Sequence, residues 1–505
     1  MSDDVRSVED LTEATASSLR VMTYVRIVVE LVLLGSMVVL ARLISPEQFG
    51  MFAIVVIVQE LAMGMPMEGV GGALVQRATI EKRHLQAGMV LALGIGLLLT
   101  VVTLVLAATL VKSAYGGHTA YLIEIATPWY VVCAAYAIPT AVLRRRLDFK
   151  RLSSLDLANN VVRSAASIAL ALGGLGAEAL LIGNFLGCLT CLALALRYAP
   201  VPWPRWDRAA ARDLLPYGGP ASAACIAWAG FRNGDYAIVG AKLGAAQAGF
   251  YWRGYQLAVE YQKKIGVLMT QMAFPVLARG DEASRALLRR RMIRLLTVVL
   301  FPLLTLLAIL APDVVPWLFG AEWEPAVRPT QILAAGGAAT LVADAAGSAL
   351  QAQGRSRALL GFGVAHFSFY LGAVLLVAGQ GLVAVAIAAS AVHGAFVVVI
   401  YGILFRHAPT ALRELTGDLG PASVSAAALA LAAIPLTLAL HEASTPAPLI
   451  ALAVAPVGGL TYLLTLRTLF RPASADLFSA LRRVLPSRLT RRRAGATATP
   501  VAVGD

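Results

Sequence analysis

The sequence predicts an all-α polytopic membrane protein with about 14 transmembrane helices, arranged as two six-helix lobes and two C-terminal helices. The first observation behind this prediction is composition: 58% of the 505 residues are hydrophobic and 14% are charged. Soluble domains carry about 25% charged residues. The second is that apolar residues gather in runs long enough to cross a bilayer. The third is that Lys and Arg gather in every second connection between these runs.

The apolar runs of the first predicted lobe lie within residues 24–197, after a polar tail of residues 1–23. A bilayer crossing takes about 20 mostly apolar residues, and each run is taken to end at Pro, Gly or a cluster of charges. The six predicted spans of this lobe are 24–43, 49–68, 85–111, 121–143, 157–175 and 177–197.

The second predicted lobe, residues 216–405, follows a linker of residues 198–215 and again holds six runs. Residues 406–470 hold two further spans, and residues 471–505 form a basic tail. The eight predicted spans of this half are 216–239, 249–277, 292–319, 329–352, 356–378, 381–405, 420–441 and 446–470.

Basic residues distinguish the two sides of the predicted protein. With the N-terminus in the cytoplasm, its tail and every second connection are cytoplasmic, and these segments hold most of the 42 Lys and Arg residues. Arg144, Arg145 and Arg146 form one such cluster. Cytoplasmic loops of membrane proteins are enriched in Lys and Arg. We therefore expect both termini in the cytoplasm, and the net charge of +13 is explained without a nucleic-acid partner.

A short segment recurs about 200 residues further along the chain. Residues 41–52, ARLISPEQFGMF, are similar to residues 241–251, AKLGAAQAGFY. At the same offset, Glu60 matches Glu260. Six predicted spans separate the two copies, which is an even number. The two lobes would therefore share one orientation and be related by an axis along the membrane normal.

Several loose motifs occur together, in a fixed order, between residues 20 and 410. They are ARLISPEQFG (41–50), GVGGALVQR (69–77), DYAIVGAKLG (235–244), FGAEWEPA (319–326) and GSALQAQG (347–354). With these motifs the chain resembles the Wzx-type flippases of lipid-linked oligosaccharides, the polysaccharide transporter branch of the multidrug/oligosaccharidyl-lipid/polysaccharide exporter superfamily. The resemblance implies a V-shaped pair of lobes around a polar cavity that opens alternately to either side of the membrane.

Ionisable residues inside predicted spans cost about 2.5–3.5 kcal/mol each, so they should face a cavity, form pairs or reach the interface. A polyprenyl pyrophosphate head group is negatively charged, and guanidinium groups fit phosphate oxygens best. The alternative for Arg26 and Arg253 is snorkelling to the interface, and for Arg232 it is pairing with Asp235 at i, i+3. The predicted substrate-binding residues are Arg26, Arg232, Arg253, Lys263 and Lys264.

Carboxylates near the middle of predicted spans are candidates for ion coupling. A carboxyl group in a low-dielectric cavity favours its neutral form and can titrate near neutral pH. For Glu260, a static ion pair with Lys264 is the favoured alternative. His366 and His393 are interpreted as packing residues rather than as proton relays. The predicted ion-coupling residues are Glu60, Glu260 and Asp344.

The sequence lacks enzyme signatures. It contains neither a GxxxxGK[ST] phosphate loop nor an HExxH metal pair, and its predicted outer loops are too short for the catalytic domain of a polymerase or ligase. The four cysteines lie in apolar segments. Two of them, Cys188 and Cys191, are close in sequence, but neither a second pair of cysteines nor a nearby His completes a metal site. We expect no catalytic residue, no metal and no cofactor.

The expected function is flipping of an undecaprenyl-pyrophosphate-linked oligosaccharide across the bacterial cytoplasmic membrane, coupled to a proton or sodium gradient. The substrate follows from the resemblance, and membrane lipids and other polysaccharide assembly proteins are the expected partners. The first alternative is a cation-coupled multidrug exporter of the same superfamily, which the abundance of intramembrane Arg and Lys disfavours. The second is a membrane polysaccharide polymerase or ligase.

Overall fold

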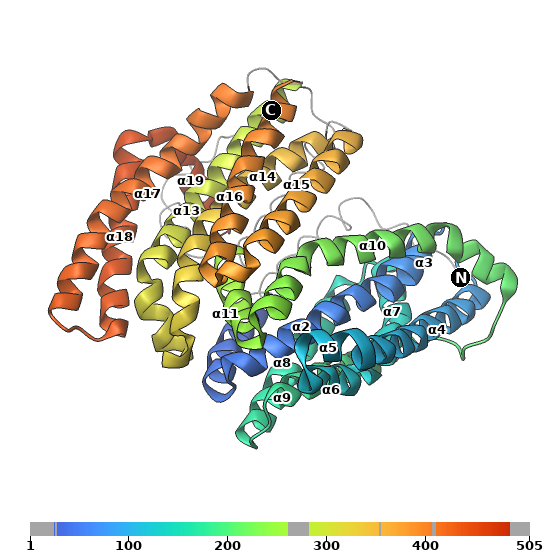
Figure 1. Cartoon of the computed structure of the whole chain (residues 1–505). Coiled ribbons are helices and arrows are strands. Elements are labelled where there is room, and N and C mark those ends of the chain that lie inside the picture. The colour runs from blue at the N-terminus through green and yellow to red at the C-terminus, as the bar shows by residue number, and fades with distance from the viewer. Residues whose placement is uncertain (1–24, 26–27, 261–281, 353–354, 407–410, 485–505) are drawn as a thin grey trace, which may run out of the picture. The chain divides into compact units, whose positions relative to one another are not determined.

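The computed structural model describes residue 25 and residues 28–260, 282–352, 355–406 and 411–484. Within these residues all regular secondary structure is helical (Figure 1), so the predicted all-α class is confirmed. The predictions made for Arg26, Lys263 and Lys264 lie outside the described residues.

The first half of the chain folds into long helices joined by short turns. A helix over residues 28–43 is followed by α2 (Pro46–Gly64), the π-helix η1 (Met65–Gly71), α3 (Gly72–Gln76), α4 (Lys82–Leu106), the π-helix η2 (Ala107–Val111), α5 (Lys112–Tyr115), α6 (Gly117–Ala126), α7 (Pro128–Arg145), α8 (Phe149–Leu172) and α9 (Ala177–Tyr198).

The second half continues in the same way. Its elements are α10 (Arg208–Leu243), α11 (Ala245–Tyr255), the π-helix η3 (Gln256–Glu260), α13 (Glu282–Phe319), the 3₁₀ helix η4 (Ala321–Ala326), α14 (Val327–Ala352), α15 (Ser356–Val377), the 3₁₀ helix η5 (Ala378–Gln380), α16 (Leu382–Phe405), α17 (Ala411–Glu442), α18 (Ala447–Leu469) and α19 (Arg471–Val484).

Every predicted span overlaps a helix in the described part of the chain. Nine helical segments there are long and apolar enough to cross a membrane. These features confirm a multi-span helical membrane protein, while the count of fourteen crossings stays a prediction.

Helix α10 starts inside the predicted linker of residues 198–215. The side chain of Asp207 caps its first turn by accepting a hydrogen bond from the backbone nitrogen of Ala210 at 2.9 Å. The sequence placed the start of the span at Pro216, but Pro216 and Pro220 lie within the helix. A proline removes one helical hydrogen bond and bends the helix, and helices in membranes tolerate this.

Two glycines allow consecutive helices to meet without a loop. Gly116, between α5 and α6, has φ 87°, and Gly244, between α10 and α11, has φ 93°. Residues with a side chain rarely adopt positive φ, whereas glycine does so at little cost. The chain therefore changes direction within a single residue at both positions.

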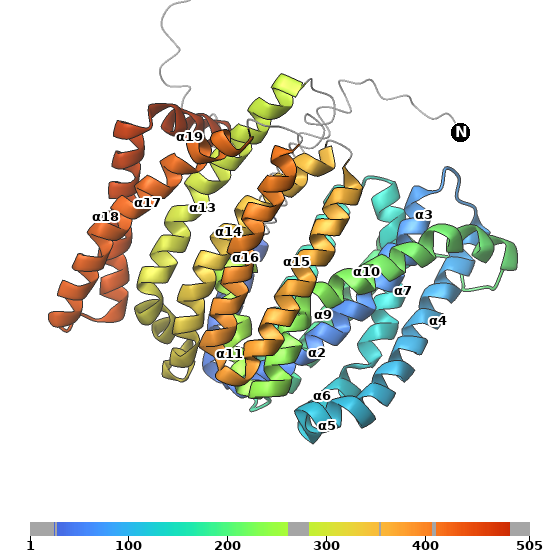
Figure 2. The same ribbon diagram turned by 45° about the horizontal axis from the view of Figure 1, so that its top comes forward.

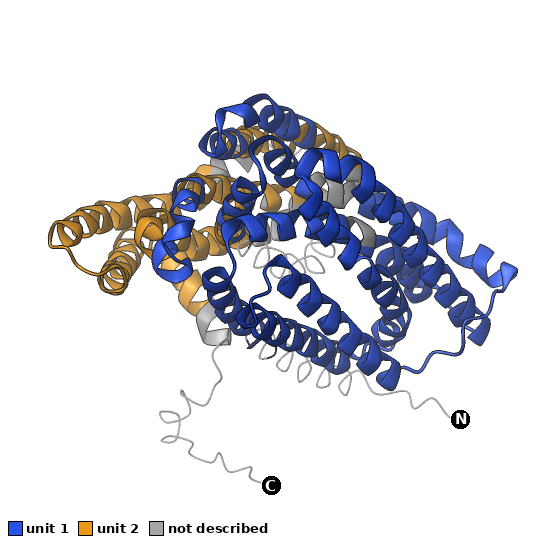
Figure 3. Cartoon of the chain, turned by 60° about the horizontal axis from the view of Figure 1, so that its bottom comes forward, with its two compact units in different colours: residues 1–256, 315–330, 367–389 blue, residues 257–314, 331–366, 390–505 orange. Residues whose placement is uncertain are grey.

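The chain divides into two compact units (Figure 3). The first comprises residues 1–256, 315–330 and 367–389, and the second comprises residues 257–314, 331–366 and 390–505. The division into two six-helix lobes stays a prediction.

Small residues bring helices together in the first unit. A Cβ atom added at Gly183 of α9 would lie 2.0 Å from Ser167 Oγ of α8, and one at Gly187 would lie 2.7 Å from Asn159 Oδ1. Such close approach is typical of helix packing in membranes, where lipid is as apolar as the side chains and contact between backbones adds attraction.

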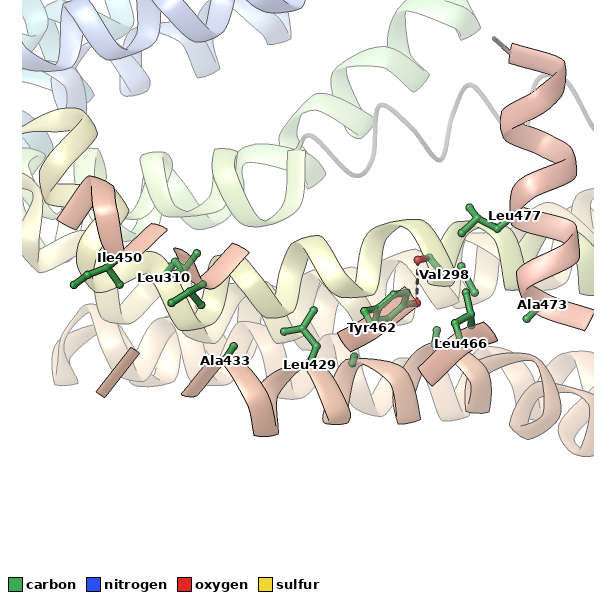
Figure 4. Close-up of a cluster of buried hydrophobic side chains, with 12 residues drawn as sticks. Val298, Leu310, Leu429, Ala433, Ile450, Tyr462, Leu466, Ala473 and Leu477 are labelled. Atoms are coloured by element: carbon green, nitrogen blue, oxygen red, sulfur yellow. Dashed lines mark hydrogen bonds between the residues drawn. The ribbon is translucent and has the colours of Figure 1, made fainter. Parts of the chain in front are cut away.

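In the second unit, α17 and α18 form a pair that packs on α13 (Figures 1 and 2). Their shared core includes Leu310, Leu429 and Val454, and the Tyr462 hydroxyl donates a 2.9 Å hydrogen bond to the Val298 carbonyl (Figure 4). The bond satisfies the polar group of an otherwise apolar cluster.

Helix α19 was not predicted, because residues 471–505 appeared only as a basic tail. It is amphipathic: Ala473 and Leu477 join the core of the second unit, whereas Phe478 is exposed. Asp476 of α19 pairs with Arg294 at 3.1 Å, and Arg294 also bonds the buried Asp418 at 2.9 Å.

Candidate functional site

Helices α2 and α11 cross at two glycines in the first unit. A Cβ atom added at Gly50 would lie 1.6 Å from the Ala245 carbonyl oxygen, and one at Gly249 would lie 2.1 Å from the Pro46 carbonyl oxygen. These residues are equivalent in the 41–52 and 241–251 repeat. The contact is therefore reciprocal between matching positions of the repeat, while a two-fold relation of the lobes stays a prediction.

The predicted substrate residue Arg253 lies beside this crossing and is 2% exposed. Its Nη1 donates a 2.9 Å hydrogen bond to Gln256 Oε1. Its guanidinium carbon also lies close to the ring centroids of Phe49 (4.5 Å), Trp323 (5.1 Å), Phe319 (5.3 Å) and Trp252 (5.4 Å).

These four rings supply the electron-rich faces that stabilise a buried cation. Trp323 is itself fully buried, and its Nε1 donates to the Ala41 carbonyl oxygen at 2.9 Å. A substrate phosphate would reach Arg253 only if this aromatic cluster opened. Its role in substrate binding stays a prediction.

A second buried polar group lies where α10, α11 and α15 meet. Asp235 is 1% exposed, and its Oδ2 accepts a 2.6 Å hydrogen bond from the Tyr370 hydroxyl. The Tyr251 hydroxyl lies 3.3 Å from that of Tyr370. Since the Tyr370 proton is directed to the carboxylate, Tyr251 is the donor in this second bond.

Glu60, a predicted ion-coupling residue, links α2 to α10. Its Oε2 accepts a 2.9 Å hydrogen bond from Asn233 Nδ2, and Asn233 is 7% exposed. The neighbouring Gln59 accepts a 3.1 Å bond from Asn184 of α9. The predicted carboxylate is therefore part of a polar contact between helices that are far apart in sequence.

The other predicted residues are described in part. Arg232 and Glu260 lie in α10 and η3, and their side chains are outside the described portion. Asp344 is exposed on α14, in the second unit. The structure brings Glu60 near the segment of α10 that carries Arg232, through Asn233.

The histidines interpreted as packing residues form a pair in the second unit. His366 Nε2 and His393 Nδ1 lie 3.1 Å apart. The His366 ring also lies 4.7 Å from the Phe396 ring, between centroids. His366 thus contacts an apolar ring, and the two histidines contact each other.

Polar residues at one end of the first unit connect α10 to the α3–α4 turn. Asp213 Oδ2 lies 3.2 Å from His84 Nε2 and 3.3 Å from Arg77 Nη2. His84 Nδ1 accepts from the Glu81 backbone nitrogen at 3.1 Å, so the Nε2 nitrogen carries the proton that bonds Asp213.

The hydrogen bond from His84, assisted by the charge of Arg77, lowers the pKa of Asp213 below its usual range. A lowered carboxyl pKa stabilises the folded protein above the unfolded value, about 3.9. This contribution is lost only as the pH falls through the lower, folded value. The Asp213 contact is therefore expected to stay intact across the neutral range.

The sequence analysis did not predict that tyrosines surround Asp235. It also did not predict that two glycines form the helix crossing. Tyr370 and Tyr251 lie in apolar runs and carry no local signal of a carboxylate partner. For Gly50 and Gly249 a signal was present, since they occupy matching positions of the repeat. In the described part of the chain, no cluster of three His, Cys, Asp or Glu side chains could hold a metal.

One family model matches the chain, and relatives of lower identity are similar to it. A family model described as polysaccharide biosynthesis protein matches residues 39–328, more than half of the chain. An uncharacterized membrane protein in the cps region of Klebsiella pneumoniae is 25% identical over 63% of this chain and 67% of its own. The lipopolysaccharide biosynthesis protein WzxC of Escherichia coli (strain K12) is 24% identical over 68% and 71%.

Among solved structures, the lipid II flippase MurJ in an inward closed conformation is similar in fold. The TM-score is 0.72 at 12% sequence identity, over 89% of this chain and 99% of that protein. At this identity the likeness concerns the fold alone.

Proposed function

The chain belongs to the polysaccharide biosynthesis protein family, and from this premise we propose that it flips an undecaprenyl-pyrophosphate-linked oligosaccharide across the cytoplasmic membrane by alternating access. The family match is the observation that carries the proposal. It is supported by the relative named for lipopolysaccharide biosynthesis and by the fold shared with the lipid II flippase. On this proposal the chain is a transporter and not an enzyme.

Two features of the first unit support alternating access. Residues of the two repeat copies close on each other at Gly50 and Gly249, and the same crossing encloses Arg253. Opening of this crossing during alternating access would expose the Arg253 guanidinium to the substrate. We assign the substrate phosphates to Arg232 and Arg253, with Arg26, Lys263 and Lys264 as further candidates.

The deciding experiment is deletion of the gene in its own host. Lipid-linked oligosaccharide is expected to accumulate in the cytoplasmic leaflet and to be cleared by the plasmid-borne gene. Purified protein in vesicles should also flip the isolated intermediate. Efflux of cationic dyes without any lipid-linked intermediate would instead indicate the drug exporter, and a loss of polymer with normal flipping would indicate a polymerase or ligase.

The proposed orientation has both termini in the cytoplasm. In a variant without the four native cysteines, Gly117→Cys and Gln380→Cys are expected to react with an impermeant thiol reagent added to intact cells, because both are exposed at helix ends, the start of α6 and the end of η5, on the predicted outer side. Ser284→Cys should react only after the membrane is permeabilised. Labelling of Ser284→Cys in intact cells would reverse the orientation.

Gradient coupling is proposed to involve Glu60, with Glu260 and Asp344 as the other candidates. Glu60→Gln keeps the size of the side chain and can still accept the Asn233 bond through its carbonyl oxygen, but it cannot titrate. Transport by this variant is expected to lose most of its dependence on pH or on a sodium gradient while folding is preserved.

Initial flipping rates in vesicles with and without each gradient measure this effect. Glu124→Gln, an exposed glutamate of α6, is the matched control and should behave as the unmodified protein. Normal gradient dependence in Glu60→Gln, Glu260→Gln and Asp344→Asn alike would place coupling elsewhere.

A further inference from the structure

An apolar pocket of about 310 Å³ lies in the first unit between α4, η1 and α10. Leu91 and Ile95 of α4 form one wall, and Val70 of η1 and Leu214 of α10 close it. Ser222 has the one polar side chain among the lining residues, and its hydroxyl already donates to the Met65 carbonyl oxygen at 3.3 Å. The pocket therefore offers hydrocarbon contacts and no ready polar partner.

The backbone of α10 shapes this pocket. Pro216 and Pro220 bend the helix, and between them Gly218 packs on η1, where an added Cβ would lie 3.1 Å from the Gly69 carbonyl oxygen. A Cβ atom at Gly219 would meet nothing within 4 Å. Gly219 is thus the place where α10 leaves space rather than filling it.

The open side of the pocket faces apolar surroundings. Leu215 is 53% exposed and Ile226 is 40% exposed at its edge. On α4, Leu97, Leu98 and Val101 are each more than half exposed. In a membrane protein such an apolar surface is covered by lipid chains.

One end of the pocket lies near a surface of interfacial character. Trp203 and Trp206, in the connection that leads into α10, are 89% and 57% exposed, and Gln86 of α4 donates to the Trp203 carbonyl oxygen at 3.2 Å. Exposed tryptophans are typical of the boundary between hydrocarbon and head groups.

Two arginines precede the α10 residues that line the pocket. Arg212 precedes Leu215 by one helical turn, and Arg208 precedes Arg212 by another, so these residues share a face of α10. Both arginines are exposed. Guanidinium groups bind phosphate oxygens through paired hydrogen bonds.

We propose that the pocket holds the first isoprene units of the polyprenyl carrier as it enters from the lipid, with Arg208 and Arg212 on its phosphates before these pass to Arg232 and Arg253. This inference rests on the proposed function and names a chain-binding site for the same substrate. A single chain fits better than a phospholipid, because the volume lies at the low end of ligand pockets, about 300–1,000 Å³, and the two chains of a phospholipid leave one glycerol together. The site lets the carrier enter from the lipid beside α10.

The experiment measures binding of undecaprenyl phosphate to the purified full-length protein by native mass spectrometry. Gly219→Leu adds a side chain at a residue that lines the pocket, where an added Cβ meets no atom within 4 Å, so affinity is expected to fall by about tenfold. Gly402→Leu is the matched control, because this exposed glycine of α16 also has nothing within 4 Å of an added Cβ. It should bind as the unmodified protein does.

A double variant at exposed residues tests the site without a change in the packed interior. Arg208→Gln with Arg212→Gln changes only exposed side chains, and affinity is expected to fall by a similar factor of about ten. Unchanged affinity in Gly219→Leu, or in the double arginine variant, would overturn the site. Displacement of the carrier by an equal amount of phosphatidylglycerol would also overturn it, since the pocket would then be a general lipid site.

Flipping by the unmodified protein separates this inference from the proposed function. If that protein flips lipid-linked oligosaccharide and the Gly219→Leu variant binds the carrier normally, the pocket assignment fails while the function stands. If the unmodified protein does not flip, the proposed function fails, and the pocket assignment fails with it.

Discussion

Gly249→Leu is expected to reduce flipping by about tenfold or more, because its side chain would occupy the space of the Pro46 carbonyl oxygen, 2.1 Å from the Cβ position. Backbone atoms cannot move aside as a side-chain end does, so α2 and α11 would have to separate. Overpacking of this kind costs about 1–3 kcal/mol, and each 1.36 kcal/mol changes a rate about tenfold. Initial flipping rates in vesicles and the melting temperature are the measurements.

The reciprocal contact provides a second test of the same prediction. Gly50→Leu would meet the Ala245 carbonyl oxygen at 1.6 Å and is expected to reproduce the effect. Gly35→Leu, in the helix over residues 28–43, has nothing within 4 Å of its Cβ and should leave flipping unchanged. Normal flipping in both Gly249→Leu and Gly50→Leu would show that the crossing does not need to close.

Helices were predictable from the sequence because an apolar run in a membrane protein has few other structures available. Without water, each backbone polar group must bond within the protein, and a helix does this locally. The ends were less predictable. The sequence predicts that a span begins at Pro216, yet α10 begins at Arg208 and continues through this proline. Helix α19 was not predicted because its apolar residues are spaced along one face rather than gathered in a run.

At the candidate site, single charged residues could be predicted from the sequence, but the side chains that contact them could not. Arg253 and Glu60 were recognised because an ionisable residue in an apolar run is conspicuous. The rings around Arg253 come from α2, α11, α13 and η4, so no local pattern announces them. The bond from Tyr370 to Asp235 likewise joins residues 135 positions apart. Contacts of this kind depend on packing between helices that sequence spacing does not encode.

Arg232→Ala is expected to abolish flipping while expression stays near normal. Arg232 lies on α10 next to Asn233, which bonds Glu60, and one turn before the buried Asp235. A pyrophosphate is the natural counter-charge for a guanidinium placed within a membrane span. Arg232→Lys should restore flipping only in part, because lysine keeps the charge but loses the two-pronged geometry. Flipping rates, expression and melting temperature are measured together.

A structural role for Arg232 leads to a different result. If its task were to pair with Asp235, Arg232→Ala would lower the melting temperature, and adding Asp235→Ala would restore both stability and flipping. The structure gives Asp235 a hydrogen-bond donor in Tyr370, whose hydroxyl lies 2.6 Å from its Oδ2. Removal of Arg232 therefore leaves the buried carboxylate with a donor.

The Arg232→Ala, Asp235→Ala double variant is accordingly expected to remain inactive. Tyr370→Phe is the variant for comparison, because it removes the hydroxyl bonded to Asp235 and keeps Arg232 in the sequence. If Asp235 is mainly stabilised by that hydroxyl, Tyr370→Phe should lower the melting temperature by more than Arg232→Ala does, since a buried carboxylate then loses this 2.6 Å hydrogen bond. Full flipping by the double variant would remove Arg232 from the substrate site and make its pairing with Asp235 its main role.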